Sequence, residues 1–306
     1  MNKPRRPPRR RVDGVLLLDK PQELSSNDAL QKARRLYNAE KAGHTGTLDP
    51  MATGLLPLCF GEATKFAGEL LDADKTYLAT VRLGVATDTG DAEGQVLETR
   101  PVEVSEAQAR AALDRFRGEI DQVPPMHSAL KRDGKPLYEY ARAGIEVERA
   151  ARRVTIHALE LSDWRGETFD LEVSCSKGTY VRTLAMDIGN ALGCGAHLTA
   201  LRRTRIGSIE IAAAATLADL EALDMAGRDA RLLAPDALVA GLQRADLDEA
   251  GTRRVLHGQG VRWPGEPGRR LRCYGDGGAF VGIGEISADG WLNPKRLVAA
   301  ANPDKT

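Results

Sequence analysis

GHTGTLDPMATGLLPLCFGEATK occupies residues 43–65 and is the densest run of functional residue types in the chain. Its first part, from Gly43 to Gly54, is rich in glycine and threonine and is predicted to be a loop between regular elements. Glycines and hydroxyls allow a tight loop whose backbone amides can face a ligand. Asp49 precedes Pro50, which favours an extended backbone and can present the carboxylate outward. The competing interpretation is a structural turn in which Asp49 caps a helix, because aspartate is common in turns.

Regular elements are predicted on both sides of this loop from apolar alternation and from helix-capping residues. The predicted strands cover residues 15–18, 77–83, 154–156, 169–173, 271–274 and 280–286. The predicted helices begin at Ser25 or Ser26, at Ser105 and near Thr183, and a further helical stretch covers 212–231. Strands placed irregularly among helices, without a strict βαβ rhythm, indicate an α+β fold with a mixed, largely antiparallel sheet and flanking helices.

Changes in residue composition divide the chain into three parts. Residues 1–11 hold six basic residues and no acid, and are expected to be a disordered basic tail. Residues 12–245 are expected to form the main α+β domain. From residue 246 to 306 glycine-rich turns separate short strands, which predicts a small β-rich domain.

Composition limits the possible classes of protein. The 306 residues carry 43 basic and 43 acidic side chains, so only local clusters such as Arg202, Arg203 and Arg205 could form a surface that attracts phosphates. No apolar run approaches the roughly 18–20 residues of a membrane span, and the first residues lack the apolar segment of a secretory signal. Four cysteines without a CxxC pair indicate reduced thiols in a cytoplasmic protein rather than a disulfide or zinc scaffold.

A second candidate stretch is CSKGTYVR, residues 175–182, where a strand is expected to end at a site edge and deliver Arg182. An arginine beside a buried carboxylate would keep that carboxylate ionised through its charge and paired hydrogen bonds. The alternative is an ordinary surface arginine or one that binds phosphate.

A third candidate is Tyr77, at the start of a predicted strand. Its ring could stack on a planar base and its hydroxyl could transfer a proton. The alternative is a core residue, since aromatic side chains in strands are more often buried than functional.

Motifs for other chemistries are weak. The chain has no GxxxxGK[ST] loop, no GxGxxG after a strand and no HExxH, and Cys194 with His197 is a single possible ligand pair. Neither a metal nor a cofactor is therefore expected. A glycine–threonine–aspartate loop would also suit a sugar-processing hydrolase, in which a carboxylate attacks an anomeric carbon. Such an enzyme needs a second carboxylate as general acid, and none is evident near the Asp49 loop.

Six stretches together resemble the bacterial tRNA pseudouridine-55 synthases of the TruB type. They are GVLLLDKPQELSSN (14–27), GHTGTLDPMATGLLPLCFGEATK (43–65), KTYLATVRLGVATDTGDAEG (75–94), SALKRDGKPLYEYARAG (128–144), CSKGTYVRTLAMDIG (175–189) and GCGAHLTALRRTRIG (193–207). They follow one another in family order. The stretch FVGIGEISADGWLNPKRLV (280–298) is similar to the small RNA-binding PUA module.

This resemblance implies an enzyme that flips one uridine out of the T loop of tRNA, cleaves its N1–C1′ bond, rotates the uracil and joins C5 to C1′. It implies no cofactor or metal, a cytoplasmic monomer, and a possible second role in tRNA folding. The residues leave open whether the aspartate attacks C1′ or promotes elimination at C2′. A pure tRNA-folding factor is a rival, and it would not need an ionised Asp49 beside Arg182.

The resemblance also implies a role for each matching residue. Asp49 would be the nucleophile, Tyr77 would stack on the target base and Arg182 would pair with Asp49. His44 would fill the gap left by the flipped nucleotide. Tyr180 and Leu201 would line the uracil pocket, and Lys20 and Pro21 would support the site. His127 departs from the family, which often has tyrosine there, so its role is left open.

Overall fold

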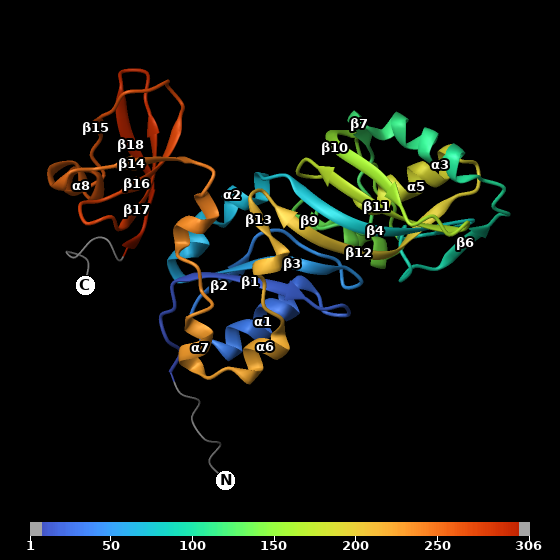
Figure 1. The fold of residues 1–306 in the computed structure, drawn as a ribbon, viewed down its shortest axis with the longest axis horizontal. Coiled ribbons are helices and arrows are strands. Elements are labelled where there is room, and N and C mark those ends of the chain that lie inside the picture. The colour runs from blue at the N-terminus through green and yellow to red at the C-terminus, as the bar shows by residue number, and fades with distance from the viewer. Residues whose placement is uncertain (1–7, 300–306) are drawn as a thin grey trace, which may run out of the picture.

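A long mixed sheet runs through the larger part of the protein, and a smaller sheet lies at one end (Figure 1). The computed structural model describes residues 8–299. The strands of the large sheet are, in spatial order, β1 (Gly14–Lys20), β3 (Thr53–Phe60), β12 (Ala196–Ile206), β4 (Lys75–Leu83), β11 (Thr168–Cys175), β10 (Arg152–Ser162) and β7 (Gly118–Gln122), with β2 (Ala42–His44) beside β3 and β13 (Ile209–Glu210) beside β12. Every pairing is antiparallel except that of β3 with β12. The predicted α+β fold with a largely antiparallel mixed sheet is confirmed.

Helices cover the sheet in two groups. Near β1 lie α1 (Ser26–Leu36), α6 (Leu217–Ala222) and α7 (Met225–Asp229), whereas α3 (Glu106–Leu113) and α5 (Val181–Ala191) lie near β10 and β12 (Figure 1). Two predicted helix starts are confirmed. Ser25 accepts a hydrogen bond from the amide of Asp28, and Ser105 forms a capping box with Gln108.

The stretch predicted to be helical over 212–231 is helical in three short pieces rather than in one helix. A 3-10 helix at Ile211–Ala213 is followed by α6 and α7 as separate short helices. Thr216 and Asp224 each accept a hydrogen bond from a backbone amide at the start of a new helix. These two polar side chains therefore divide the alanine-rich segment, because each stabilises a helix N-terminus where a continuous helix would run on.

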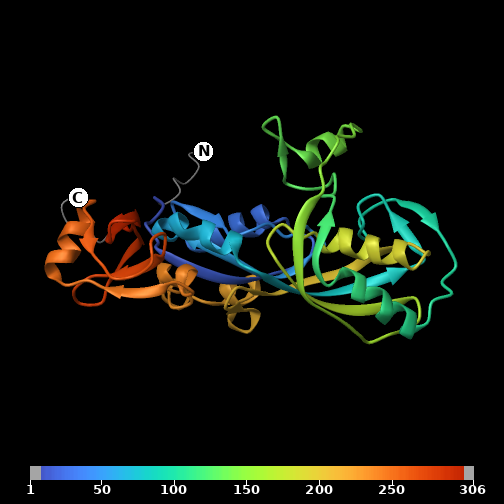
Figure 2. The same cartoon turned by 90° about the horizontal axis from the view of Figure 1, so that it is seen from above.

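Shorter elements connect the main ones. They are α2 (Ala67–Asp72), α4 (Leu137–Arg142), the hairpins β5 (Val85–Thr87) with β6 (Val96–Thr99) and β8 (Lys131–Arg132) with β9 (Lys135–Pro136), and 3-10 helices at Gly61–Phe66, Asp114–Phe116 and Pro235–Val239. The β8–α4 segment projects away from the large sheet (Figure 2). Its base, around Ser128, returns to the centre of the molecule and contributes to the cavity described below.

The smaller sheet has the strand order β14 (Gln243–Asp246), β16 (Arg270–Tyr274), β17 (Phe280–Ile286), β18 (Trp291–Leu297) and β15 (Val261–Arg262), with α8 (Glu249–Leu256) against it. A β-rich C-terminal part is thus present. It shares a core with the larger part, since Ile283 packs in one apolar cluster with Leu17 and Leu55. The rings of Phe66 and Phe280 lie 5.3 Å apart across this junction.

The N-terminal segment is described from residue 8 onward, so residues 1–7 of the predicted tail lie outside the described range. Arg10 forms an ion pair with Asp229 and donates to the carbonyl of Tyr37 at 2.9 Å.

All four cysteines are buried free thiols. Within residues 8–299, the helices are too short or too polar to cross a lipid bilayer.

The close pairing of β3 with β12 depends on Gly54. Its φ is +102°, and a Cβ there would lie 2.3 Å from the carbonyl oxygen of Arg203. We expect Gly54→Ala to lower the free energy of unfolding by roughly 3 kcal/mol or more, since φ strain of ~1–2 kcal/mol adds to an overlap of ~1–3 kcal/mol. Gly118→Ala is the control, because Gly118 has φ +79° but open space around its Cβ position. Equal losses for both variants in urea unfolding would contradict the close approach.

Candidate active site

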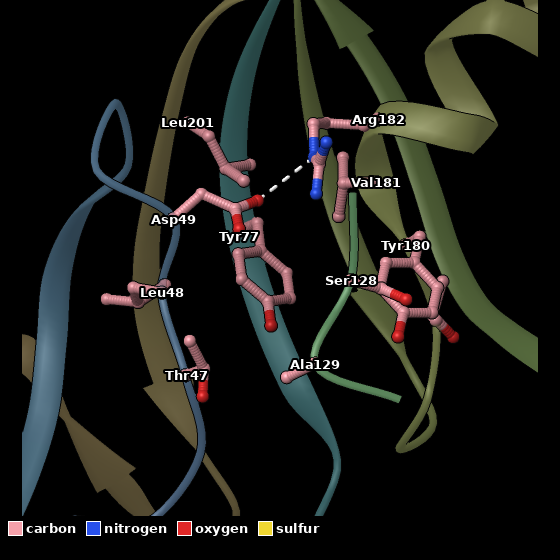
Figure 3. A pocket seen from close by; sticks show the side chains of 11 residues that line it. Thr47, Leu48, Asp49, Tyr77, Ser128, Ala129, Tyr180, Val181, Arg182 and Leu201 are labelled. Carbon is pink, nitrogen blue, oxygen red and sulfur yellow. Dashed lines mark ion pairs between the residues drawn. The ribbon is translucent and has the colours of Figure 1, made fainter. Parts of the chain in front are cut away.

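A cavity of about 230 Å³ lies where the centre of the large sheet meets three loops (Figure 3). Its size suits a single small ring better than a drug-sized molecule, for which roughly 300–1,000 Å³ is typical. The wall is formed by Thr47, Leu48, Asp49, Tyr77, Ser128, Ala129, Thr179, Tyr180, Val181, Arg182 and Leu201. The structure thus brings together five residues predicted as site residues from distant parts of the sequence, namely Asp49, Tyr77, Tyr180, Arg182 and Leu201.

Asp49 lies in a turn between β2 and β3 that is bonded to the segment after β1. The hydroxyl of Ser26 accepts from the amide of Leu48 at 2.7 Å and donates to its carbonyl at 3.0 Å. The amide of Glu23 donates to the carbonyl of Pro50 at 2.9 Å, and the amide of Ala52 closes the turn onto the carbonyl of Asp49. These bonds satisfy the backbone of the turn and direct its side chain at the cavity.

Lys20 bonds the backbone of the same turn and does not line the cavity. Its side chain is fully buried, and its ammonium donates to the carbonyls of Pro21, Leu24 and Pro50 at 2.8, 2.6 and 3.4 Å. Burial lowers the pKa of Lys20 to about 8, and the charge of Asp49 acts in the opposite direction. Pro21 lines a different cavity, together with Thr53 and Leu217.

Arg182 lies in the first turn of α5, not at the end of a strand as predicted, because β11 already ends at Cys175 and the helix begins at Val181. Its Nε lies 3.0 Å from Oδ2 of Asp49, as the dashed line in Figure 3 shows. Nη1 donates to the carbonyl of Thr89 at 2.9 Å and Nη2 to the carbonyl of His127 at 2.7 Å. His127 therefore contributes its backbone, not its side chain, to the site.

Asp91 is a second carboxylate beside Arg182, so the expectation that none lies near Asp49 is wrong. Its Oδ2 is 3.4 Å from Nη1 of Arg182, and its side chain is only 4% exposed. It accepts hydrogen bonds from the hydroxyl of Thr89 and the amide of Glu93. Asp91 does not line the cavity, because Arg182 lies between it and Asp49. Only the three-dimensional fold brings it there, and no spacing in the sequence signals the contact.

Opposing effects act on the carboxyl group of Asp49. Burial raises its pKa, the charge and hydrogen bond of Arg182 lower it, and the charge of Asp91 raises it again. The net direction is upward. Arg182, and to a smaller extent the charge of Lys20, therefore favour the ionised, nucleophilic form against burial.

Aromatic and apolar side chains complete the cavity wall. Figure 3 shows the ring of Tyr77 below the ion pair, with Tyr180 and Ser128 on the side opposite Leu48 and Thr47. Burial raises the pKa of Tyr77. His44 ends β2 and does not line this cavity, and its Nδ1 finds no hydrogen-bond partner among the described residues.

Gln122 is a further supporting residue that the sequence patterns did not predict. This buried side chain at the end of β7 accepts from the amide of Tyr180 at 2.8 Å and donates to its carbonyl at 3.1 Å. The two bonds fix the backbone of Tyr180 at the point where α5 begins. A lone glutamine carries no local signal of such a contact.

The predicted basic surface at 202–205 is wrong for Arg203. Arg202 is partly exposed and pairs with Asp19 at 2.6 Å, but Arg203 is only 1% exposed. Alternate residues of a strand point to opposite faces, so neighbouring arginines cannot all share one surface.

Among residues 8–299, no group of three or more His, Cys, Asp or Glu side chains is placed to hold a metal ion.

Comparison with protein-family profiles identifies the class of protein. The profile for the TruB family pseudouridylate synthase N-terminal domain matches residues 34–181. Residues 182–244 match the tRNA pseudouridylate synthase B C-terminal domain, and residues 244–298 match the profile described as pseudouridine synthase II TruB, C-terminal. All three profiles describe pseudouridine synthases, which are isomerases.

Individual relatives agree with this class. A protein of Azoarcus sp. (strain BH72) named tRNA pseudouridine synthase B is 62% identical over 96% of this chain and 98% of its own length. One of the same name from Chromobacterium violaceum is 59% identical over 98% of each chain. The crystal structure of an archaeal box H/ACA sRNP Nop10–Cbf5 complex contains a chain with a TM-score of 0.71 and 25% identity, covering 94% of this chain and 86% of that one. This chain belongs to the TruB family of pseudouridine synthases.

The charges around Asp49 predict opposite effects of two substitutions. Asp91→Asn removes a negative charge and should lower the pKa of Asp49, whereas Arg182→Met removes the favourable positive charge and should raise it. The measurement is carboxyl carbon NMR of aspartate-labelled protein across pH, with Asp49→Asn assigning the signal. Asp163→Asn is the control, since this exposed residue pairs with Arg165 and does not line the cavity. Shifts of the same sign in both variants would contradict the arrangement.

Proposed function

We propose that this chain converts one uridine of tRNA, at position 55 of the T loop, into pseudouridine, with Asp49 as the nucleophile. The observation that carries this proposal is a carboxylate, ion-paired to a buried arginine, at the end of a small cavity with two tyrosines in its wall. The names of the Azoarcus and Chromobacterium relatives support tRNA as the substrate.

The proposed reaction is balanced within the substrate. The carboxylate of Asp49 attacks C1′ as the N1–C1′ bond breaks, and the bonding electrons leave with N1 of the uracil. The detached ring rotates, C5 bonds to C1′, and the aspartate is released. The proton lost from C5 is replaced by one gained at N1, so no cofactor or oxidant is consumed. A carboxylate that forms a covalent intermediate at an anomeric carbon divides one difficult step into two.

The cavity fits the demands of such a base. A uridine paired or stacked in RNA cannot be reached, so it must be flipped out, and the few kcal/mol lost must be regained by stacking and burial in the pocket. Tyr77 offers a ring for stacking, and Tyr180 and Leu201 close the wall. His44, on the neighbouring β2 strand, is proposed to fill the gap that the flipped nucleotide leaves in the RNA.

A sugar-processing hydrolase is the weaker candidate. Its general acid would have to reach a leaving group in the cavity. Two further carboxylates lie close by, Asp91 beside Arg182 and Glu93 beside the backbone of Met51, but neither belongs to the cavity wall. A glycosyl substrate would therefore meet a nucleophile without an acid, which suffices only if the leaving group stays bound and is rejoined, as in the proposed isomerisation.

We also propose that residues 12–245 form the catalytic domain and residues 246–306 a PUA-like RNA-binding domain, acting as a cytoplasmic monomer. In the second part Trp263 and Trp291 line a hollow with Arg254 and Arg262. The guanidinium of Arg262 lies 4.5 Å from the centre of the Trp291 ring. Aromatic faces beside cationic groups suit stacking on bases and contact with phosphates.

Asp49→Asn should abolish isomerisation while tRNA affinity falls less than about tenfold, roughly 1.4 kcal/mol, because phosphate contacts supply most of the affinity. Tritium release from C5-labelled uridine in tRNA transcripts measures turnover, and filter binding measures affinity. The exposed Asp163 provides the control variant Asp163→Asn, which should retain full activity. Turnover by Asp49→Asn above background would remove Asp49 from the mechanism.

The double variant Arg254→Gln with Arg262→Gln tests the C-terminal RNA contact. Losing two phosphate contacts should flatten the slope of log affinity against log salt by about 1.4–1.8. The charge-matched control is Arg244→Gln with Arg269→Gln, whose guanidinium groups already pair with Asp246 and Glu266. If both double variants bind tRNA with the wild-type slope, the hollow beside Trp291 does not contact phosphate.

A further inference from the structure

Arg203 is the least exposed arginine in the described part of the chain, with an exposed fraction of 1%. No carboxylate of the described residues lies within ion-pair distance of it. Burying an unpaired guanidinium is costly, so a protein retains one only where it is well hydrogen-bonded or needed. The reaction proposed above does not use Arg203 directly, and its burial therefore calls for an explanation.

Arg203 lies on β12, between the strand that follows the Asp49 loop and the strand that carries Tyr77. In the register of the strands it pairs with Gly54 of β3 on one side and with Tyr77 of β4 on the other. Directly opposed residues of adjacent strands have their side chains on the same face, with Cβ atoms ~4.5–5.5 Å apart. Leu201, two residues earlier on β12, lines the cavity with Tyr77, so the Arg203 side chain lies on the cavity's face of the sheet.

The hydrogen bonds of Arg203 reach both ends of the Asp49 loop. Nε donates to the carbonyl of Leu55 at 2.8 Å, and Nη2 donates to that of Gly46 at 3.4 Å. Two glycines of the loop leave room for this arrangement. Gly46, with φ +94°, lies beside Nη1, and Gly54 lies against the Arg203 backbone. The guanidinium is thus enclosed by the loop that presents Asp49.

The same guanidinium acts on the hydroxyl of Tyr77. Burial raises the pKa of Tyr77, but the charge of the neighbouring Arg203 lowers it. Tyr77 is partly buried, and a phenol in such a place with a cation beside it can release and recover a proton at lower cost than one without the cation.

We propose that Arg203 is a positioning residue for the reaction: it holds Tyr77 relative to Asp49, because it bonds the Asp49 loop and lies directly opposite Tyr77 on the neighbouring strand. Arg182 acts on Asp49, and Arg203 acts on Tyr77. Arg182 lines the cavity from α5, whereas Arg203, on β12, lies opposite Tyr77 and is not part of the cavity wall. The inference rests on the proposed function, since it assigns Arg203 a role in that reaction.

The test is a double-mutant cycle in single-turnover assays on tRNA, with wild type, Arg203→Met, Tyr77→Phe and the combined variant. Tyr77→Phe should be slower by about 10²–10⁴-fold, as expected when a proton-transfer group is lost. Arg203→Met should be slower by at least about tenfold, with tRNA affinity within about threefold of wild type. Because Arg203 acts through Tyr77, the combined variant should be no more than about threefold slower than Tyr77→Phe alone.

A spectroscopic readout separates this role from simple support of the fold. The ultraviolet titration of Tyr77, taken as wild type minus Tyr77→Phe, should move to higher pH in Arg203→Met, since the lowering charge is lost. Arg228→Met is the matched control. Arg228 also donates to backbone carbonyls, those of Leu220, Leu36 and Glu221, but it lies on α7. This variant should lose thermal stability and keep the wild-type rate and titration.

Several outcomes would overturn the inference. They are independent, multiplying losses in the cycle, an unchanged tyrosine titration, or a fully active Tyr77→Phe. If Arg203→Met does not fold, Arg203→Lys replaces it, and a wild-type rate there would show that the planar fork is not needed. Failure of both variants to fold would assign Arg203 to the fold alone. Wild-type protein that releases no tritium would contradict the proposed function instead, which keeps the two failures distinct.

Discussion

The guanidinium of Arg182 is the constraint around which the cavity is built. It meets the carboxylates of Asp49 and Asp91 and the carbonyls of Thr89 and His127. Removing a cation from water costs several kcal/mol, and it is offset only when its donors all find acceptors in good geometry. The four acceptors belong to three separate loops. Keeping one carboxylate ionised inside the protein therefore requires these loops to meet at a single point.

Local signals explain which parts of the fold could be predicted. The strands at 15–18, 77–83 and 280–286 and the caps at Ser25 and Ser105 were correct, because apolar alternation and capping depend on neighbours in sequence. The central strand β12 was not predicted. Its sequence, AHLTALRRTRI, looks like a polar surface segment, since nothing local reveals that the charge of Arg203 is buried and satisfied by two carbonyls on β3 and the Asp49 loop.

The same division applies to the site. Asp49, Tyr77 and Arg182 could be proposed as candidates because they occur in dense motifs, and their convergence on one cavity came from resemblance to a family rather than from spacing. Asp91 and Gln122 could not be proposed at all, because each acts through one contact with a residue far away in sequence. Residues that support a site through long-range hydrogen bonds leave no periodic trace. They are found only once the strands are paired.

The junction between the two parts of the chain bears on how an RNA would be read. Domains in one chain usually move relative to each other unless the interface between them is large and apolar. Here the smaller sheet contributes Ile283 to a core shared with β1 and β3, and Arg270 forms a two-pronged ion pair with Glu69 at 2.7 and 2.9 Å. Such a junction resists hinge motion. The spacing between the cavity and the Trp291 hollow is therefore set by the protein, and an RNA that contacts both must have a shape that matches it.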